Sequence, residues 1–340
     1  MGKDASSPDG TPPLEKGGQG GIASSSGASF KKNDPHPEFL RKIPTSPLQG
    51  EVRIGDALVC GATLLSQSET PLLDARILLK HILAIDDAAL IARARETLTP
   101  EQVEHYNALL ARRAGCEPVA YITGTKEFWS LDFKVTSDVL IPRDDSGALI
   151  EAVLARRNRN EALRIADLGT GSGCLLCALL SEFPASEGVG IDCSPAAVSI
   201  ARANANMLGL SARAQFIEGD WLAPASGTFD VIIANPPYIP LGDRDSLALD
   251  VAAFEPAGAL FAGADGFDAY RQILAQAPDR LAGDGLMIME CGPDQADSLA
   301  LMLRGMAGAA EPFTMRDLAG RPRGAGFDRR NADKSLQKRD

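Results

Sequence analysis

Hydrophobic positions between residues 51 and 121 recur at the spacing of helices. Thr70 and Pro71 open one segment as a cap residue followed by a first-turn proline. The positions after them that share one helix face are Leu73, Ile77, Leu78, His81 and Ile82.

A second helix begins at a capping box. Thr99 and Gln102 are three residues apart, so the side chain of each can accept a hydrogen bond from the backbone N–H of the other. The apolar positions around this helix are Leu98, Val103, Tyr106 and Leu110, and Gly115 is its expected end. We therefore predict a small helical bundle domain over residues 51–121.

The pattern changes to short β-like runs after Ile122. Apolar and aromatic residues gather around Phe128–Trp129 and over Leu131–Val135. These runs predict a β-hairpin linker over residues 122–141.

From about Asp144 onward, short apolar runs alternate with helical stretches. The runs cover residues 163–168, 188–191, 214–217, 229–234 and 286–290. Such alternation is typical of a parallel sheet with helices on both faces. We predict an α/β domain over residues 142–328.

The two ends of the chain show no such pattern. Residues 1–50 contain 8 Gly, 7 Pro and 7 Ser, a composition that cannot bury enough apolar surface to offset the entropy of ordering. We predict disordered tails over residues 1–50 and 329–340.

Charge narrows the choice of partners. The 340 residues include 34 Lys and Arg against 45 Asp and Glu, for a formal net charge of −11. Binding through phosphates relies on Lys and Arg, so we expect no direct contact with nucleic acid. No apolar stretch approaches the ~20 residues that span a bilayer, and the N-terminus lacks the apolar core of a secretory leader. We expect a cytoplasmic protein without a membrane segment.

Histidine and cysteine usage limits the chemistry. The three histidines are His36, His81 and His105, so the C-terminal two-thirds of the chain holds no His-dependent triad or His-rich metal site. We predict no metal. Cys174 and Cys177 form a C-x-x-C pair at apolar helix positions, and we predict that they pack in the core.

A glycine-rich loop follows the first apolar run of the α/β domain. It consists of Gly169, Thr170, Gly171, Ser172 and Gly173. Glycines at the carboxyl edge of a first strand let a ligand approach the backbone closely. The next predicted strand ends in Asp192, whose carboxylate can accept hydrogen bonds from both ribose hydroxyls of a nucleoside.

Two cofactors fit this loop, NAD and S-adenosylmethionine. The glycine spacing departs from the Gly-x-Gly-x-x-Gly dinucleotide pattern, which favours the methyl donor. Trp221, which follows Gly219 and Asp220 after the third strand, offers an indole face for an adenine ring.

The fourth predicted strand runs into Asn235-Pro236-Pro237-Tyr238. Two prolines stop the strand and stiffen the backbone at the sheet edge where open α/β sheets bind ligands. The Asn235 side-chain carbonyl and the Pro236 backbone carbonyl are two acceptors suited to the two hydrogens of an NH₂ group on a planar carbon. Tyr238 adds an aromatic face, and hydrogen bonds that draw on the protons raise the electron density on nitrogen in the transition state.

Besides methyl transfer to the NH₂ group of a carboxamide, three other functions remain open at this point. A DNA or RNA amino-group methyltransferase acting at adenine N6 or guanine N2 would need a basic face or a recognition insert, and the sequence shows neither. A nicotinamide-dependent oxidoreductase would leave Asn235–Tyr238 without a role. The third is a protein that binds its partner without catalysing a reaction.

In these residues the chain resembles the protein-(glutamine-N5) methyltransferases that modify peptide chain release factors, the HemK/PrmC family. The resemblance covers about Val52 to Phe327. The matching stretches are residues 117–124, 127–133, 141–143, 167–173, 235–238, 254–256 and 263–267.

The resemblance implies a helical domain that docks the substrate, followed by a class I (Rossmann-like) methyltransferase domain with a seven-stranded, mostly parallel sheet whose last strand is antiparallel. The substrate would be the glutamine of the Gly-Gly-Gln motif in release factors 1 and 2, and we expect a monomer. The implied S-adenosyl-L-methionine contacts are Gly169, Thr170, Gly171, Ser172, Gly173, Asp192, Trp221 and Asn235. Catalysis would fall to Asn235, Pro236 and Tyr238, and substrate binding to these three with Pro237.

One stretch departs from the family. The usual sequence after Ile-Pro is Arg-Pro-Glu-Thr-Glu, whereas here Arg143 is followed by Asp144, Asp145, Ser146 and Gly147. The first carboxylate and the hydroxyl are kept, and the final Glu is replaced by Gly147. We assign no catalytic role to this segment from the sequence.

Overall fold

The computed structural model describes residues 48–306 and 310–331. Most of the predicted tail over residues 1–50 and of the predicted tail over residues 329–340 lies outside the described residues. The parts that are described differ from the prediction. Leu48 is buried in the helical core, and Arg329–Asn331 form a 3-10 turn, η4, in which Arg330 pairs with Glu161.

The N-terminal part of the described chain is helical, as the sequence predicts. Its elements are α2 (Ile54–Leu64), α3 (Pro71–Leu83), α4 (Asp87–Ala92), α5 (Pro100–Ala114) and the short α6 (Val119–Thr123). They enclose one hydrophobic core, in which Leu78, Tyr106 and Leu110 are fully or almost fully buried. The Tyr106 hydroxyl donates to the carbonyl of Ala75 (3.0 Å), which satisfies the one polar group of this large buried side chain.

The buried face of α3 differs from the predicted one. Ala75, Leu78 and Leu79 are inside, whereas Leu73 is 50% exposed. The helix is rotated because Asp74 is also turned inward, where it pairs with Arg113 of α5 (2.7 Å). An inward carboxylate is tolerated when a cation and hydrogen-bond donors surround it.

The capping box that opens α5 is present as predicted. The Thr99 hydroxyl accepts from the backbone N–H of Gln102 (3.3 Å), and the Gln102 side chain accepts from the backbone N–H of Thr99 (2.9 Å). Two N–H groups that the first helical turn leaves unpaired are therefore satisfied.

Thr99→Ala is expected to lower the free energy of unfolding by about 1 kcal/mol, because one of these N–H groups loses its acceptor. Urea denaturation followed by circular dichroism measures the change. Thr99→Ser keeps the hydroxyl and should stay close to the parent protein. Equal denaturation midpoints for the alanine and serine variants would show that the cap contributes nothing.

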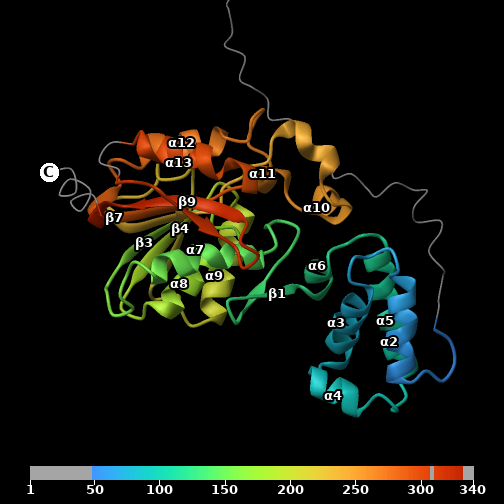
Figure 1. The fold of residues 1–340 in the computed structure, drawn as a ribbon. Helices are drawn as coiled ribbons and strands as arrows, with labels where there is room; N and C mark the ends of the chain where they lie inside the picture. Colours follow the sequence, from blue (N-terminus) through green and yellow to red (C-terminus); the bar gives the residue numbers. More distant parts are fainter. Residues whose placement is uncertain (1–47, 307–309, 332–340) are drawn as a thin grey trace, which may run out of the picture. The chain divides into compact units, whose positions relative to one another are not determined.

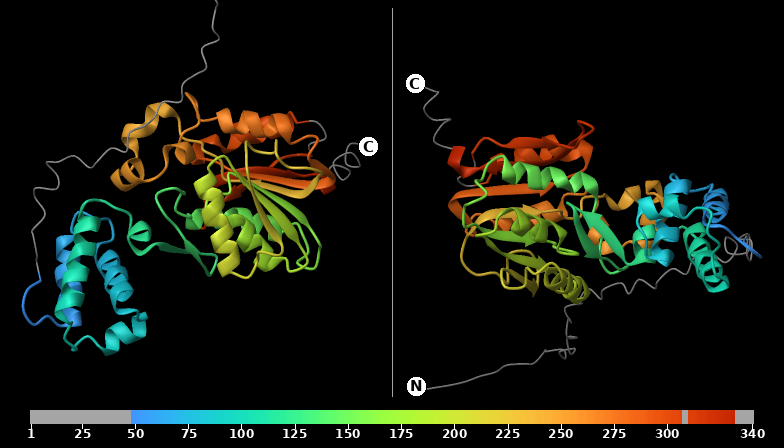
Figure 2. Two further views of the ribbon diagram at one scale, coloured as in Figure 1. Left: turned by 180° about the vertical axis from the view of Figure 1, so that it is seen from behind. Right: turned by 90° about the horizontal axis from the view of Figure 1, so that it is seen from below.

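A two-stranded antiparallel hairpin, β1 (Thr125–Phe128) and β2 (Leu131–Lys134), follows the helices (Figure 2). Phe128 and Phe133 bury their rings in the core of the α/β part. The Lys134 N–H donates to the Asn204 side chain on α9 (Pro195–Met207) at 2.8 Å. The hairpin predicted from the aromatic run is therefore confirmed, and it is anchored to the α/β part.

The described residues contain one seven-stranded sheet in the order β5-β4-β3-β6-β7-β9-β8 (Figure 1). The strands are β3 (Arg164–Leu168), β4 (Glu187–Asp192), β5 (Ala214–Glu218), β6 (Phe229–Ala234), β7 (Leu281–Glu290), β8 (Phe313–Arg316) and β9 (Pro322–Asp328). The neighbours from β5 to β7 pair in parallel, and β9 runs antiparallel to both β7 and β8. The α/β class and the antiparallel last strand are confirmed.

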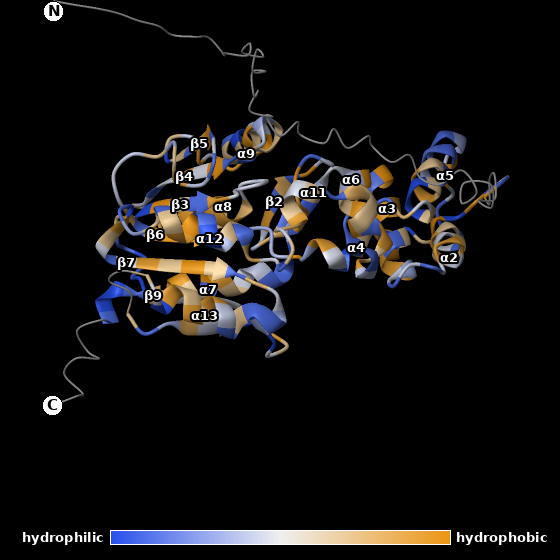
Figure 3. Ribbon diagram, turned by 90° about the horizontal axis from the view of Figure 1, so that it is seen from above, coloured by the Kyte–Doolittle hydropathy of each residue, from blue (hydrophilic) through white to orange (hydrophobic). Residues whose placement is uncertain are grey.

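Helices cover both faces of this sheet, with α12 and α13 on one face and α7, α8 and α9 on the other (Figure 1). Their bounds are α7 (Gly147–Leu154), α8 (Cys174–Glu182), α9 (Pro195–Met207), α12 (Asp268–Gln276) and α13 (Ala296–Arg304). Alternate strand residues enter the two cores: Ile233 and Ile288 face one side, and Ile232 and Met289 the other. Because both faces are covered, the second half of β7 is a continuous hydrophobic run (Figure 3).

Two residues of α8 test the interpretation of the C-x-x-C pair. Cys177 is fully buried in the core and Cys174 packs against it. Their core-packing role is confirmed.

Short elements border the carboxyl edge of the sheet. They are the 3-10 turns η1 (Asp144–Ser146), η2 (Leu241–Ser246) and η3 (Pro293–Gln295), and the helices α10 (Leu249–Phe254) and α11 (Ala257–Leu260). Three of them, η2, α10 and α11, are inserted between β6 and α12. Among the described residues, no helix has the length and apolar character needed to cross a bilayer.

Candidate active site

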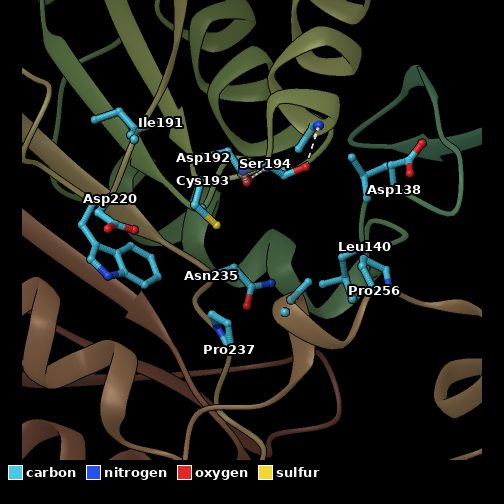
Figure 4. A pocket seen from close by; sticks show the side chains of 18 residues that line it. Asp138, Leu140, Ile191, Asp192, Cys193, Ser194, Asp220, Asn235, Pro237 and Pro256 are labelled. Carbon is cyan, nitrogen blue, oxygen red and sulfur yellow. Dashed lines mark hydrogen bonds between the residues drawn. The ribbon is translucent and has the colours of Figure 1, made fainter. Parts of the chain in front are cut away.

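A cavity of about 210 Å³ lies at the carboxyl edge of the sheet (Figure 4). Gly169 after β3, Asp192 at the end of β4, Trp221 after β5 and Asn235 after β6 all line it. Residues that are far apart in the sequence meet here because parallel strands end at the same edge.

Positive backbone angles shape the glycine loop. Gly169 (φ +69°) and Gly171 (φ +54°) line the cavity, and both lie in the left-handed region that side chains other than glycine rarely adopt. A Cβ at Gly169 would stand 3.6 Å from the Trp221 ring. Glycine at these positions therefore keeps the backbone open to a ligand.

Three other residues that were predicted to contact the methyl donor lie behind the cavity wall. Thr170 and Ser172 are buried and, like Gly173, do not line the cavity. The Thr170 hydroxyl donates to Asp167 Oδ2 (2.6 Å), and a Cβ at Gly173 would lie 3.1 Å from Ala201. In this structure the three residues hold the loop against the sheet and α9.

Asp192 faces the cavity with a carboxylate that backbone donors already orient. Oδ2 accepts from Gly171 N–H and Oδ1 accepts from Ser194 N–H, both at 2.9 Å. Burial raises the pKa of Asp192, and these two hydrogen bonds act in the opposite direction. Each oxygen keeps a further lone pair for a ligand hydroxyl.

Trp221 forms another wall of the same cavity. Its indole N–H donates to Gln272 Oε1 (2.7 Å), which fixes the ring plane. Asp220 lines the cavity beside it. A flat ring and a carboxylate are the two groups that an adenine face and its donor edge require.

A second cavity of about 100 Å³ adjoins the first. Leu140, Asn235 and Ala259 line both cavities, and the second adds Arg143, Tyr238 and Glu290. Asn235 therefore stands where the two cavities meet.

The Asn-Pro-Pro-Tyr segment is distributed over both cavities. Pro237 lines the larger one beside Asn235 (Figure 4) and Tyr238 lines the smaller, whereas Pro236 is buried. The backbone carbonyl of Tyr238 accepts from Gln295 Nε2 (2.9 Å), which ties the turn to η3. Burial, helped by the charge of Glu290, raises the pKa of Tyr238 to about 12, so the phenol stays neutral.

Sequence reasoning assigned no role to Arg143 and Glu255, which form an ion pair beside the smaller cavity. The distance between Arg143 Nη2 and Glu255 Oε1 is 2.5 Å, and Glu255 is buried. The pair joins the segment before η1 to the turn between α10 and α11. Both residues belong to stretches that match the family, and this match was the signal in the sequence that could have identified them.

The segment that departs from the family still contacts the site. Asp145 pairs with Arg323 of β9 (2.5 Å), and the Ser146 hydroxyl accepts from Asn235 Nδ2 (3.2 Å). At Gly147 an added Cβ would lie 3.3 Å from the Trp129 ring. The space for a larger side chain at this position is therefore taken by Trp129.

Glu290 is a site residue that sequence reasoning missed. It ends β7, is 2% exposed and lines the smaller cavity. Burial raises its pKa to about 7, and hydrogen bonding by Ser146 and Asn235 and the charge of Arg323 oppose the rise. A carboxylate closing an otherwise apolar strand, Leu286–Glu290, is the pattern that could have identified it.

Among the described residues, no three His, Cys, Asp or Glu side chains are grouped to hold a metal ion.

Comparison with known proteins gives a consistent result. The family described as "PrmC N-terminal domain" matches residues 56–124, and "Methyltransferase small domain" matches residues 144–277. The release factor glutamine methyltransferase of Rhodospirillum rubrum is 44% identical over 256 residues, covering 75% of this chain and 78% of that protein. That of Bradyrhizobium diazoefficiens is 42% identical over 261 residues, covering 76% and 88%.

Similar solved structures include the ribosomal protein L11 methylase of Lactobacillus delbrueckii subsp. bulgaricus. The two are 19% identical with a TM-score of 0.41, over 56% of this chain and 80% of that one.

Proposed function

Because the chain belongs to the family of release factor glutamine methyltransferases, we propose that it methylates the side-chain amide nitrogen (N5) of the glutamine in the Gly-Gly-Gln motif of release factors 1 and 2. S-adenosyl-L-methionine is the methyl donor. Because release factors act on the ribosome, the proposal also places the enzyme in the cytoplasm.

The observation that carries the proposal is the position of Asn235 between two cavities. The larger cavity offers glycines, a carboxylate and an indole, and the smaller one offers Arg143, Tyr238 and Glu290. A transferase needs its donor and its acceptor to meet at one point. Asn235 lines both cavities and supplies a side-chain amide at that point.

The larger cavity fits the methyl donor. The open backbone at Gly169 and Gly171 admits a ligand close to the chain, where a Cβ would intrude. Asp192 can accept the two ribose hydroxyls, and Trp221 can stack on the adenine. S-adenosylmethionine held by these residues would supply an electrophilic methyl group, with the thioether of S-adenosylhomocysteine as the leaving group and the displaced amide proton released to water.

The Asn235–Tyr238 turn can compensate for the weak nucleophilicity of the substrate's amide nitrogen. An amide nitrogen is a weak nucleophile because its lone pair is delocalised into the carbonyl. Two acceptors, Asn235 Oδ1 and the Pro236 carbonyl, would hold both N–H groups and leave the lone pair directed at the donor cavity. Their hydrogen bonds strengthen as positive charge develops on nitrogen, so they stabilise the transition state more than the bound substrate.

Asn235 and Tyr238, the two side chains proposed to contact the substrate amide, are uncharged, which suits the reaction. Asn235 provides an acceptor without a full charge, and Tyr238 keeps its proton because its pKa is raised to about 12. The flat face of Tyr238 can cover the planar carboxamide and exclude water from it.

Incubation with methyl-labelled donor and purified release factor, followed by tandem mass spectrometry, tests the proposal. The label should appear on the Gly-Gly-Gln glutamine and should be absent from a release factor in which that glutamine is replaced by Glu, which has the same shape but no NH₂ group. Label on another residue, or label transferred to DNA or RNA and not to the protein, would overturn it.

A further inference from the structure

The proposed reaction requires the carbonyl of Asn235, and not its NH₂ group, to face the substrate amide. A carboxamide that turns by 180° exchanges these two groups while keeping nearly the same shape. The turned form would set the NH₂ group of Asn235 against the NH₂ group of the substrate, a contact between two donors. Some neighbour must therefore fix the orientation of Asn235.

Ser146 alone does not fix it. Asn235 Nδ2 donates to Ser146 Oγ at 3.2 Å. A hydroxyl is both a donor and an acceptor, so it would pair equally with the Oδ1 atom of a turned amide. A third group has to decide which way the hydroxyl hydrogen points.

Glu290 is placed to make that decision. Its buried carboxyl lines the smaller cavity together with Asn235, and the polar groups of Ser146 and Asn235 lower its pKa. Within the described part of the chain, Glu290 Oε2 has no hydrogen-bond partner, so the carboxyl keeps free acceptor capacity. An ionised carboxylate only accepts, so it draws the Ser146 hydrogen and an Asn235 N–H towards itself.

We propose that ionised Glu290 is a positioning residue, which acts together with Ser146 to hold the Asn235 amide with its carbonyl towards the substrate. The proposal rests on the proposed function. Glu290 does not need to touch the reacting atoms, because the direction of the hydrogen bonds passes from it through Ser146 to Asn235.

The charge state of Glu290 is balanced by its surroundings. Arg323 of β9 favours the ionised form and Asp145 of η1 opposes it. The other titratable groups that sense its charge are Cys174, Tyr238, Tyr270 and Cys291. Tyr270 donates its hydroxyl hydrogen to the backbone carbonyl of Glu290 (2.8 Å) and so holds the end of the strand.

The hydrogen-bond direction reverses when Glu290 is protonated. Its pKa of about 7 places this change in an accessible range. A protonated carboxyl can donate to Ser146, which can then donate to Asn235 Oδ1 and turn the NH₂ group of Asn235 towards the substrate. Activity should therefore fall as the pH drops through about 7.

Steady-state kinetics of Glu290→Gln test the proposal, because glutamine mimics the protonated, uncharged carboxyl. At pH 8 we expect kcat to fall about 10- to 100-fold with donor Kd changed less than threefold. Wild-type kcat should fall about tenfold per pH unit below 7, and the variant should lack this limb. Asp284→Asn, in the exposed first half of the same strand, is the matched control. A Glu290→Gln enzyme with the kcat and pH profile of the wild type would overturn the proposal.

Ser146 provides a second test that does not depend on how Glu290→Gln folds. Ser146→Ala should lose about tenfold in kcat, and Ser146→Thr, which keeps the hydroxyl, should recover to within about threefold of wild type. Equal kcat for the wild type and the alanine variant would contradict the proposal.

NMR of the side-chain amides separates failure of this inference from failure of the proposed function. The NH₂ resonances of Asn235, identified by their loss in Asn235→Ala, should shift with a midpoint near pH 7 in the wild type and not in Glu290→Gln. This holds whichever substrate is methylated. Resonances that do not respond between pH 6 and 8 would overturn the inference. If the wild-type enzyme transferred no labelled methyl group to the release factor, only the proposed function would be overturned.

Discussion

Asn235→Ala is expected to lower kcat about 10³-fold and to change donor affinity only slightly. In the proposed mechanism the side-chain carbonyl of Asn235 is one of the two acceptors that hold the substrate amide. Removing one such group from an active site costs about 10²- to 10³-fold in rate. The expectation is at the upper end because the substitution also removes the N–H group that Asn235 donates to Ser146. The donor would keep its proposed contacts at Gly169, Gly171 and Asp192, which line the larger cavity.

Single-turnover kinetics with labelled donor and release factor measure the rate, and calorimetry measures donor Kd. Asn206→Ala, an exposed position on α9, controls for the loss of an asparagine as such. If kcat of Asn235→Ala stayed within a few-fold of the wild type, Asn235 would have no part in the reaction. If donor Kd rose as much as kcat fell, Asn235 would belong to donor binding alone.

Asp192→Ala is expected to raise donor Kd about 100-fold with a much smaller effect on kcat at saturating donor. Hydrogen bonds to a charged acceptor contribute about 1.5–3 kcal/mol each, and every 1.4 kcal/mol is a factor of ten in Kd. Burial already raises the pKa of this carboxyl, and a pair of ribose hydroxyls would add donors that favour its ionised form.

Calorimetric titration with S-adenosylhomocysteine measures this effect without turnover. Asp192→Asn should lose less affinity because it keeps one acceptor oxygen. Glu187→Ala lies at the opposite end of the same strand, β4, and is the matched control. An unchanged donor Kd in Asp192→Ala would place the ribose somewhere else.

The sequence predicted the sheet well because its strands are buried on both faces. Phe229–Ala234 has the same bounds in the structure as in the prediction, and Leu163–Leu168 differs by one residue. A strand covered by helices on both sides is a continuous apolar run, which is easy to recognise. The pattern gave no run for β8 or β9. Pro322–Asp328 contains two glycines and few large apolar residues.

The rotation of α3 could not be predicted from apolar spacing. The pattern placed Leu73 on the buried face and did not include Asp74, whereas in the structure Leu73 is exposed and Asp74 is buried. The deciding interaction is the pair between Asp74 and Arg113, two residues on different helices. Periodicity within one helix carries no information about such a partner.

The candidate site was predicted in part. Gly169, Gly171, Asp192 and Asn235 line the larger cavity, and the sequence pointed to them because each follows or ends a recognisable strand and all such ends meet at one edge. Thr170, Ser172 and Gly173 were predicted with them but do not line the cavity. Arg143, Glu255 and Glu290 were not assigned roles, because their importance comes from contacts between distant segments: Arg143 with Glu255, and Glu290 with Ser146 and Asn235. The predicted domain boundaries and the catalytic assignments remain predictions.

A crystal structure of the enzyme with S-adenosylhomocysteine and a peptide carrying Gly-Gly-Gln tests the central claim most directly. We predict the glutamine NH₂ group within hydrogen-bond distance of both Asn235 Oδ1 and the Pro236 carbonyl, with its nitrogen facing the donor sulfur. A complex in which the carboxamide lies outside this corner, or in which the corner binds a different chemical group, would contradict the account.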